Sequence, residues 1–223
     1  MARRSLEPLD ALRLLGGGPV ALVTTRWRKQ TNVMPAIWTT PLSRTPPLIG
    51  VVVNPARYTH DMVRFSEEFA LNFPARDLMN HTQYFGTVSG DNVGKLDLAK
   101  MPTFRASRIE APLIENCVAW IECSLDDAMR IGDHTLFIGR VLSVQAEKEA
   151  FDETWTVEEP DFKPLHYLGI DRYATLGKAV TAELRTTDDG AIDLAETPDE
   201  REQRLEAEAL ERERAQREGE EKP

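Results

Sequence analysis

The chain contains little cysteine, and its two thiols are spaced too far apart to pair. Cys117 and Cys123 are the only cysteines in 223 residues. On a single strand they would lie about 20 Å apart, at roughly 3.3 Å per residue, which is far beyond the reach of a disulfide. Free, buried thiols are typical of proteins in a reducing compartment. We therefore expect a cytoplasmic protein.

The chain also lacks a long apolar run. Its longest stretch without a charged residue covers residues 30–43, which is 14 residues and includes Gln, Asn, Thr and Ser. A membrane-spanning helix needs about 20 mostly apolar residues. Near the N-terminus, Glu7, Asp10 and Arg13 interrupt any apolar signal core. The sequence thus predicts neither a membrane span nor a secretion signal.

The 27 basic side chains are outnumbered by 37 acidic ones. The net charge is −10, and residues 181–223, with 15 acidic and 7 basic side chains, carry −8 of it. A nearly neutral body offers no basic surface for nucleic acid. We predict one domain at residues 1–180 and an acidic tail at residues 181–223. Residues 197–200 have the form of a capping box, which predicts a solvated helix or a disordered end, with a partner-binding helix as the alternative.

Several well-known site motifs are missing. The sequence has no P-loop, no His-Glu-x-x-His, no Cys-x-x-Cys and no nucleophile elbow. The glycine run at residues 16–18 precedes a predicted strand, whereas a phosphate-cradling loop follows one, so this run ends a helix. The four histidines are far apart in the chain and lack ligand spacing. We therefore expect no metal site and no hydrolase triad.

What is present is a pattern of many short strands and a few short helices. The predicted helices cover residues 5–15, 59–68 and 77–85. The predicted strands cover residues 20–25, 32–40, 48–53, 69–73, 117–125 and 134–145. Residues 41–47 are predicted to connect the second strand to the third. The Pro46-Pro47 pair in this segment forbids a helix there. Short strands linked by turns favour a barrel or a sandwich over a doubly wound sheet.

Residues 54–61 form the most suggestive segment. The chain leaves a strand, turns at Pro55 and enters a helix for which Thr59 is a good N-cap. Free N–H groups at a helix start favour an anion, and Arg57 offers a fork of donors that matches a phosphate. The alternative is structural: Thr59 only caps the helix, and Arg57 only lies in a solvated loop.

Two further features suit a ligand site. The strand at residues 34–40 could lay a flat heteroaromatic ring along its backbone, although an ordinary barrel strand with Trp38 in the core fits the pattern equally well. His134 begins a strand at the predicted barrel rim, where a histidine can steer a ligand or donate a hydrogen bond near a redox centre. The alternative for His134 is a plain surface histidine.

Taken in chain order, these segments resemble the flavin reductase-like family of FMN-binding split barrels, and in detail its flavoredoxin-type members. Residues 18–25 resemble the first barrel strand, residues 32–40 the strand that faces the isoalloxazine, and residues 46–51 the Pro-Pro-Leu strand. Residues 54–61 resemble the phosphate-binding turn, residues 69–72 the following strand, and Ser89-Gly90 with Lys95 the Ser-Gly…Lys segment. Residues 132–139 resemble a late strand, and residues 167–169 and 173–177 the closing segment. The similarity covers roughly residues 8–177.

The resemblance implies a mainly β fold with short helices: a Greek-key split β-barrel that binds FMN. It implies that the phosphate is held by Arg57, Thr59 and Lys95, with Ser89 also among the cofactor-binding residues. The implied lining of the ring consists of Ala36, Ile37, Trp38, Thr39 and Thr40. Asn72 would contact the ribityl chain or the phosphate, and His134 is the candidate catalytic residue on the nicotinamide side.

The resemblance further implies a homodimer and an oxidoreductase that takes electrons from NADH or NADPH. Bound FMN would pass them to free flavin or to a protein partner. One alternative is a flavoredoxin-like electron carrier without nicotinamide turnover. A third interpretation is a structural partner protein that docks through its acidic tail and leaves the barrel empty.

Overall fold

The structure is a computed structural model that describes residues 7–180, 182, 185–186, 192–193, 199–200, 202–207 and 209–210. The chain divides into two compact units, Met1–Gly177 and Lys178–Pro223, and each is described by itself.

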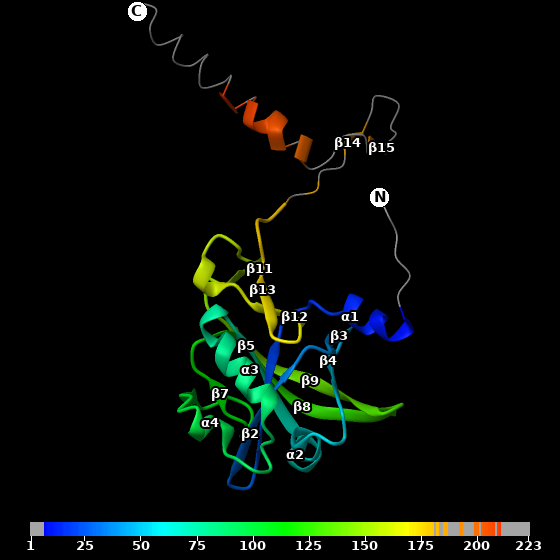
Figure 1. Cartoon of the computed structure of the whole chain (residues 1–223), viewed down its shortest axis with the longest axis vertical. Helices are drawn as coiled ribbons and strands as arrows, with labels where there is room; N and C mark the ends of the chain where they lie inside the picture. The colour runs from blue at the N-terminus through cyan, green and yellow to red at the C-terminus, as the bar shows by residue number, and fades with distance from the viewer. Residues whose placement is uncertain are drawn as a thin grey trace, which may run out of the picture. The chain divides into compact units, whose positions relative to one another are not determined.

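The first unit is built on a seven-stranded sheet in the order β2-β1-β5-β8-β9-β4-β3, in which every pair of neighbours is antiparallel. Its strands are β1 (Ala21–Trp27), β2 (Gln30–Ala36), β3 (Thr39–Arg44), β4 (Pro47–Val53), β5 (Glu68–Pro74), β8 (Cys117–Ile131) and β9 (His134–Ala146). The long β8–β9 hairpin reaches beyond its neighbours on one side (Figure 1). The predicted mainly β fold is confirmed.

The two edge strands of this sheet are consecutive in the chain. Only Ile37 and Trp38 separate the end of β2 from the start of β3. A link of two residues spans only about 10 Å, so the sheet must curve until its two edges approach each other at this corner. The backbone N–H of Val52 in β4 donates to the carbonyl of Trp38 at 2.9 Å and fixes the link. The result is the predicted split barrel.

Short helices and small strand pairs complete this unit. The helices are η1 (Pro8–Asp10), α1 (Ala11–Leu14), α2 (Tyr58–Ser66), η2 (Arg76–Leu78), α3 (Met79–Thr87), α4 (Lys95–Leu98) and η3 (Pro160–Phe162). The strand pairs are β6 (Thr103–Phe104) with β7 (Leu113–Ile114), β10 (Phe151–Asp152) with β11 (Thr154–Trp155), and β12 (Leu165–Gly169) with β13 (Arg172–Thr175). Helix α3 lies across the face of the sheet that Figure 1 shows, in contact with β2.

The core has two layers, one on each face of the sheet. Val23 and Phe69 belong to the layer inside the barrel, whereas Leu22 and Ala70 belong to the layer beneath α3 and α4. Successive side chains of a strand point to opposite faces, so a strand buried on both sides needs an unbroken apolar run. This explains the Ala-Leu-Val sequence that opens β1, and it explains why Cys117 and Cys123 are both buried and free.

Two predictions about the second and third strands were wrong. The strand predicted at residues 32–40 ends at Ala36, and a new strand begins at Thr39, because the chain turns from one sheet edge to the other between them. The connection predicted at residues 41–47 is mostly strand β3. Pro41 is tolerated there because β3 is an edge strand, where a missing N–H breaks no ladder on its outer side.

The helices also differ from prediction. The helix predicted at residues 5–15 is reduced to η1 and α1, and residue 5 lies outside the described residues. Leu9 and Leu15 are exposed, so packing adds nothing to a segment too short to be stable alone. Helix α2 begins at Tyr58 with Arg57 as its N-cap, so the prediction that Thr59 caps this helix was wrong. It ends where Glu67 takes a left-handed conformation, with φ of 54°.

In the second unit, residues 199–200, 202–207 and 209–210 are helical, and Arg185–Thr186 pairs with Ile192–Asp193. The capping residues predicted at 197 and 198 lie outside the described residues. Within the described part of the chain, no helix is long and apolar enough to cross a membrane. No group of three or more His, Cys, Asp or Glu side chains suited to a metal ion occurs among those same residues.

Candidate functional site

A cavity of about 200 Å³, called here the phosphate cavity, lies at the corner where β4 turns into α2. Four of the residues predicted to bind the cofactor line it: Arg57, Thr59, Ser89 and Lys95. They come from two segments that are far apart in sequence, residues 57–59 and residues 89–95, and β2 contributes further lining residues. The fold thus brings together the part of the predicted site that carries positive charge.

Lys95 is the most unusual residue of this cavity. Its side chain is buried, and its ammonium donates to the carbonyls of Val33 at 2.9 Å and Phe85 at 2.7 Å. An ammonium has three N–H donors, so one is left over. Burial, with the nearby charge of Arg57 as a second cause, lowers the pKa of Lys95 to about 8. A buried cation is costly unless an anion accompanies it.

No carboxylate supplies that anion in the part of the chain that the structure describes. Its ion pairs involve Arg13, His60, His134, Arg140 and Lys178, and neither Lys95 nor Arg57 is among them. Both cations line the same cavity. The phosphate cavity therefore concentrates positive charge without a counter-charge from these described residues, which is the electrostatic character of an anion site.

The turn before α2 adds backbone donors to this charge. The N–H of Ala56 donates to the Asn54 side chain and the N–H of Arg57 to the Asn54 carbonyl, both at 2.9 Å, which closes the turn. Of the first helical N–H groups, that of His60 donates back to the Arg57 carbonyl at 2.8 Å. The N–H groups of Tyr58 and Thr59 have no acceptor within the helix, because they belong to its first turn. They favour an anion at this end.

Asn32 in β2 lines the same cavity as Arg57. Its Nδ2 donates to Oγ1 of Thr59 at 2.7 Å, and its Oδ1 is buried without a hydrogen-bond partner. A Cβ added to Gly90 would lie 2.0 Å from that oxygen, so glycine is required where the loop passes Asn32. An orphaned acceptor beside two cations points to a ligand that brings its own hydroxyl.

A second cavity of about 360 Å³, called the strand cavity, adjoins the first. Ala36, Ile37, Trp38 and His134 line it, and Arg57 and Pro35 line both cavities. The rings of Trp38 and His134 lie 4.9 Å apart between centroids. Nδ1 of His134 lies 2.8 Å from a carboxylate oxygen of Asp133, and this hydrogen bond holds the pKa of Asp133 below its ordinary value. His134 indeed begins β9, as predicted.

Three predicted residues are not brought to either cavity. Thr39 and Thr40 lie on edge strand β3, where the Thr40 hydroxyl donates to the Pro41 carbonyl at 3.3 Å. Asn72 is fully buried in the sheet, where its Nδ2 donates to the Leu22 carbonyl and to Thr24, and its Oδ1 accepts from the N–H of Ile114. Every polar atom of the Asn72 side chain is thus engaged within the barrel.

The lining residues that were not predicted to bind the cofactor include Asn32, Pro35 and Tyr58. Asn32 is the first residue of the strand predicted at residues 32–40, and it pairs with Thr25 of β1. Asparagine is depleted in strands, which was a signal that could have been used. Pro35 lines both cavities, and Tyr58 donates to Oε1 of Gln30 at 2.7 Å at the mouth of the phosphate cavity. No local pattern distinguishes these two from ordinary strand and helix residues.

The fold and the site define a class of protein: an antiparallel split barrel with a cation-lined cavity at a strand–turn–helix corner. Comparison with known proteins is more specific. The family model described as flavin reductase like domain matches residues 16–177. The chain belongs to the flavin reductase-like family, as the resemblance of its segments indicated.

Individual relatives agree with this assignment. The chain is 33% identical over 183 residues to the uncharacterised protein YddH of Escherichia coli (strain K12), covering 79% of this chain and 96% of that protein. An FMN-binding protein from Thermus thermophilus, solved with bound p-hydroxybenzaldehyde, is 29% identical with a TM-score of 0.69, covering 82% of this chain and 99% of that one. Flavoredoxin from Methanosarcina acetivorans, at 24% identity and a TM-score of 0.72, covers 85% of this chain and 99% of its own, and shares the fold.

Proposed function

We propose that the chain is an FMN-binding oxidoreductase of the flavin reductase type. The single observation that carries the proposal is the buried ammonium of Lys95, which faces the phosphate cavity beside Arg57 with no carboxylate partner in the part of the chain that the structure describes. A phosphate dianion provides the missing charge. The printed name of the Thermus relative, an FMN-binding protein, supports the choice of flavin nucleotide.

The lining residues fit such a ligand. Arg57 and Lys95 would pair with the phosphate, and the hydroxyls of Thr59 and Ser89 and the first N–H groups of α2 would donate to it. The unpartnered Oδ1 of Asn32 would accept a hydroxyl from the sugar-like chain next to the phosphate. The cavity thus provides both donors for an anion and an acceptor for a polyol.

The strand cavity suits the ring of the same molecule. It adjoins the phosphate cavity through Pro35 and Arg57 and is lined mainly by apolar side chains with the Trp38–His134 ring pair at its edge. Bound flavin supplies the hydride chemistry, so the protein needs no nucleophile of its own. The residues of the chain hold the ring, exclude water from one side and leave His134 to orient a second molecule.

We further propose that NADH or NADPH is the electron donor, and that free flavin or a protein partner is the acceptor. The test is anaerobic mixing of FMN-loaded protein with each nicotinamide, followed at the flavin absorption band. Bleaching with either donor supports a reductase. A flavin band that persists with both, yet bleaches with dithionite, supports an electron carrier instead.

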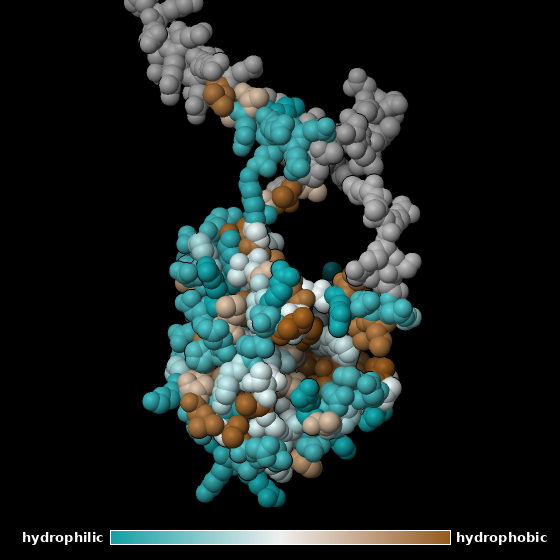
Figure 2. Space-filling model, viewed as in Figure 1, coloured by the Kyte–Doolittle hydropathy of each residue, from teal (hydrophilic) through white to brown (hydrophobic). Residues whose placement is uncertain are grey.

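A homodimer is part of the proposal. Trp38, Leu42, Met129 and Ile131 are exposed apolar residues of the β2–β3 corner and the β8–β9 hairpin, and exposed apolar side chains of this kind mark association surfaces. In Figure 2, apolar side chains gather to one side of α3, over β12 and the ends of β3 and β4. Sedimentation equilibrium at a chain mass of 25.2 kDa distinguishes a dimer from a monomer.

A further inference from the structure

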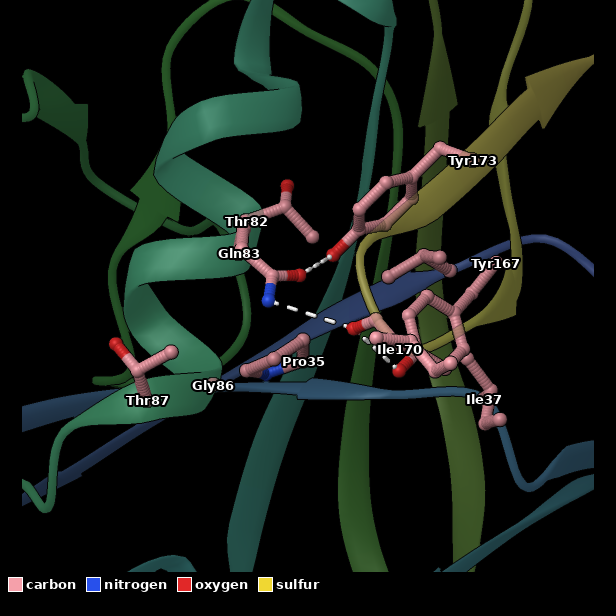
Figure 3. Close-up of a pocket in the computed structure, with 10 residues that line it drawn as sticks. Pro35, Ile37, Thr82, Gln83, Gly86, Thr87, Tyr167, Ile170 and Tyr173 are labelled. Carbon is pink, nitrogen blue, oxygen red and sulfur yellow. Dashed lines mark hydrogen bonds between the residues drawn. The ribbon is translucent and has the colours of Figure 1, made fainter.

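A third cavity, of about 320 Å³, lies between α3 and the β12–β13 hairpin (Figure 3). Gln83 and Thr87 of α3 form one wall, Tyr167 and Tyr173 of the hairpin another, and Pro35 and Ile37 the floor. This cavity, called the tyrosine cavity, contains none of the cations of the phosphate cavity. Pro35 and Ile37 also line the strand cavity, whereas Gln83, Thr87, Tyr167 and Tyr173 have no role in the proposed flavin site.

The lining selects against charged molecules. None of the ten residues that line the tyrosine cavity carries a formal charge, and an ion placed among neutral side chains without a partner pays a large desolvation cost. The hydroxyl of Tyr173 is protonated at neutral pH, because the ordinary pKa of tyrosine is about 10 and burial raises the pKa of Tyr173 further. An occupant of this cavity is therefore a neutral molecule.

The shape of the walls favours a flat molecule. The rings of Tyr167 and Tyr173 meet edge to face with 5.2 Å between centroids and an interplanar angle of 61°. Pro35 and Ile37 add aliphatic surface to the same cavity. Aromatic and aliphatic walls of this kind bury a planar ring without requiring polar partners along its faces.

Two polar groups are left with capacity for a ligand: the Thr82 hydroxyl, whose buried Oγ1 has no hydrogen-bond partner among the described residues, and the Gln83 amide. Oε1 of Gln83 accepts from the Tyr173 hydroxyl at 2.6 Å, which holds the amide in place, and its Nε2 reaches the Ile170 carbonyl only at 3.5 Å. That carbonyl already accepts from the Tyr167 hydroxyl at 2.9 Å. Figure 3 shows these hydrogen bonds linking α3 to the β12–β13 hairpin. The Gln83 N–H groups thus form an oriented donor with one weak contact, which a ligand carbonyl can replace.

We propose that the tyrosine cavity binds a small, neutral, flat molecule with a ring carbonyl, of the aryl ketone or quinone class, whose oxygen accepts from Nε2 of Gln83. Because Pro35 and Ile37 also line the strand cavity, a molecule bound here adjoins the proposed flavin ring. The tyrosine cavity shares Pro35 and Gly86 with the phosphate cavity but contains none of its cations, and the test below uses protein without flavin, so this proposal and flavin binding can fail independently.

The test is an NMR titration of the full chain, without flavin, using 1-indanone as the probe and indane as the matched compound without a carbonyl. We expect saturable binding of 1-indanone, with indane about tenfold weaker because it lacks the hydrogen bond. A carboxylated indanone should not bind measurably. Absence of saturation by 1-indanone, or equal binding of the three compounds, overturns the proposal.

Variants assign the binding to this cavity. Gln83→Leu should lower the affinity for 1-indanone about tenfold and leave the affinity for indane unchanged. Gln145→Leu, on strand β9, should change neither affinity. Tyr173→Phe keeps the ring but frees the Gln83 amide, so the affinity for 1-indanone should fall about threefold. Circular dichroism checks that each variant folds. If Gln83→Leu does not fold, the result with Tyr173→Phe tests the proposal. An unchanged preference for indanone over indane in a folded variant overturns the proposal.

Discussion

Asn32 and Thr59 are joined by a buried hydrogen bond of 2.7 Å from Nδ2 to Oγ1. This bond uses the Thr59 oxygen as an acceptor and leaves its O–H to donate elsewhere, because a hydroxyl has one donor and two lone pairs. It also ties β2 to the first turn of α2. The two elements that form the phosphate cavity are thus held together by a side chain that is itself predicted to bind the ligand.

Replacing this hydroxyl should cost both stability and affinity. Thr59→Val leaves the buried Asn32 amide without its acceptor, so the free energy of unfolding should fall by about 1–3 kcal/mol. FMN should bind roughly tenfold more weakly, while Thr59→Ser should retain most of both. Urea denaturation and a fluorescence titration with FMN measure the two effects. Unchanged FMN affinity in folded Thr59→Val would remove Thr59 from the site.

Arg57 should affect affinity alone. The residue is exposed, so Arg57→Ala should barely change the free energy of unfolding, yet it should weaken FMN by about 1.5–3 kcal/mol, the range for hydrogen bonds to charged groups. Arg64→Ala, on the exposed side of the same helix, is the matched control. Calorimetric titrations with FMN and riboflavin give the comparison. A loss that is equal for the two flavins would show that Arg57 does not contact the phosphate.

The lowered pKa of Lys95 predicts how the stability of the protein and its affinity for FMN depend on pH. Its pKa is lowered from 10.5 to about 8 in the folded protein, so between these values the unfolded chain binds more protons and stability without ligand should rise with pH. Below about pH 8 the lysine is charged in both states and its burial penalty is constant. A bound phosphate favours the charged form and raises this pKa.

FMN affinity should therefore be greatest below pH 8 and fall above it, and binding at pH 8.5 should take up protons. Calorimetry in two buffers of different ionisation enthalpy counts those protons. The uptake should vanish in Lys95→Met and with riboflavin as the ligand. Proton uptake that persists in Lys95→Met would assign it to another group.

His134 should affect the reaction with the nicotinamide donor and not the binding of FMN. Its ring lies against Trp38 at the edge of the strand cavity, outside the phosphate cavity. His134→Ala should slow reduction of bound FMN by NADH or NADPH about tenfold, the value of one lost hydrogen bond, with FMN affinity unchanged. Stopped-flow bleaching measures the rate. A variant that loses FMN affinity in proportion would place His134 on the flavin instead.

The sequence could predict the elements that depend on local patterns. The apolar run of β1, the strand at β4 and the hairpin strand that starts at His134 are all visible in one segment each, and the structure has them. The break at Ile37–Trp38 was not visible, because it depends on the sheet curving until its edges meet. Pro41 also misled the prediction, since only the strand order shows that β3 is an edge.

The residues of the site also fall into two groups: those that a local pattern shows and those that only the fold brings together. Arg57 could be found because strand, turn and helix signals flank it within eight residues. Lys95 and Ser89 came from the resemblance alone, because their approach to Arg57 depends on how α3 and α4 pack over β2. Asn32 was missed since its partner, Thr59, lies 27 residues away. Thr59 was assigned as a cap because a local pattern cannot show a competing partner from another strand.

The central claim is that the cavity between Arg57 and Lys95 binds the phosphate of a flavin nucleotide. The most direct test is a paired titration of the purified chain with FMN and with riboflavin, which differ only in that phosphate. FMN should bind at least a hundredfold more tightly, about 2.7 kcal/mol, and purified protein soaked in FMN should stay yellow after desalting. Equal affinities, or no retained flavin in folded protein, would contradict the claim.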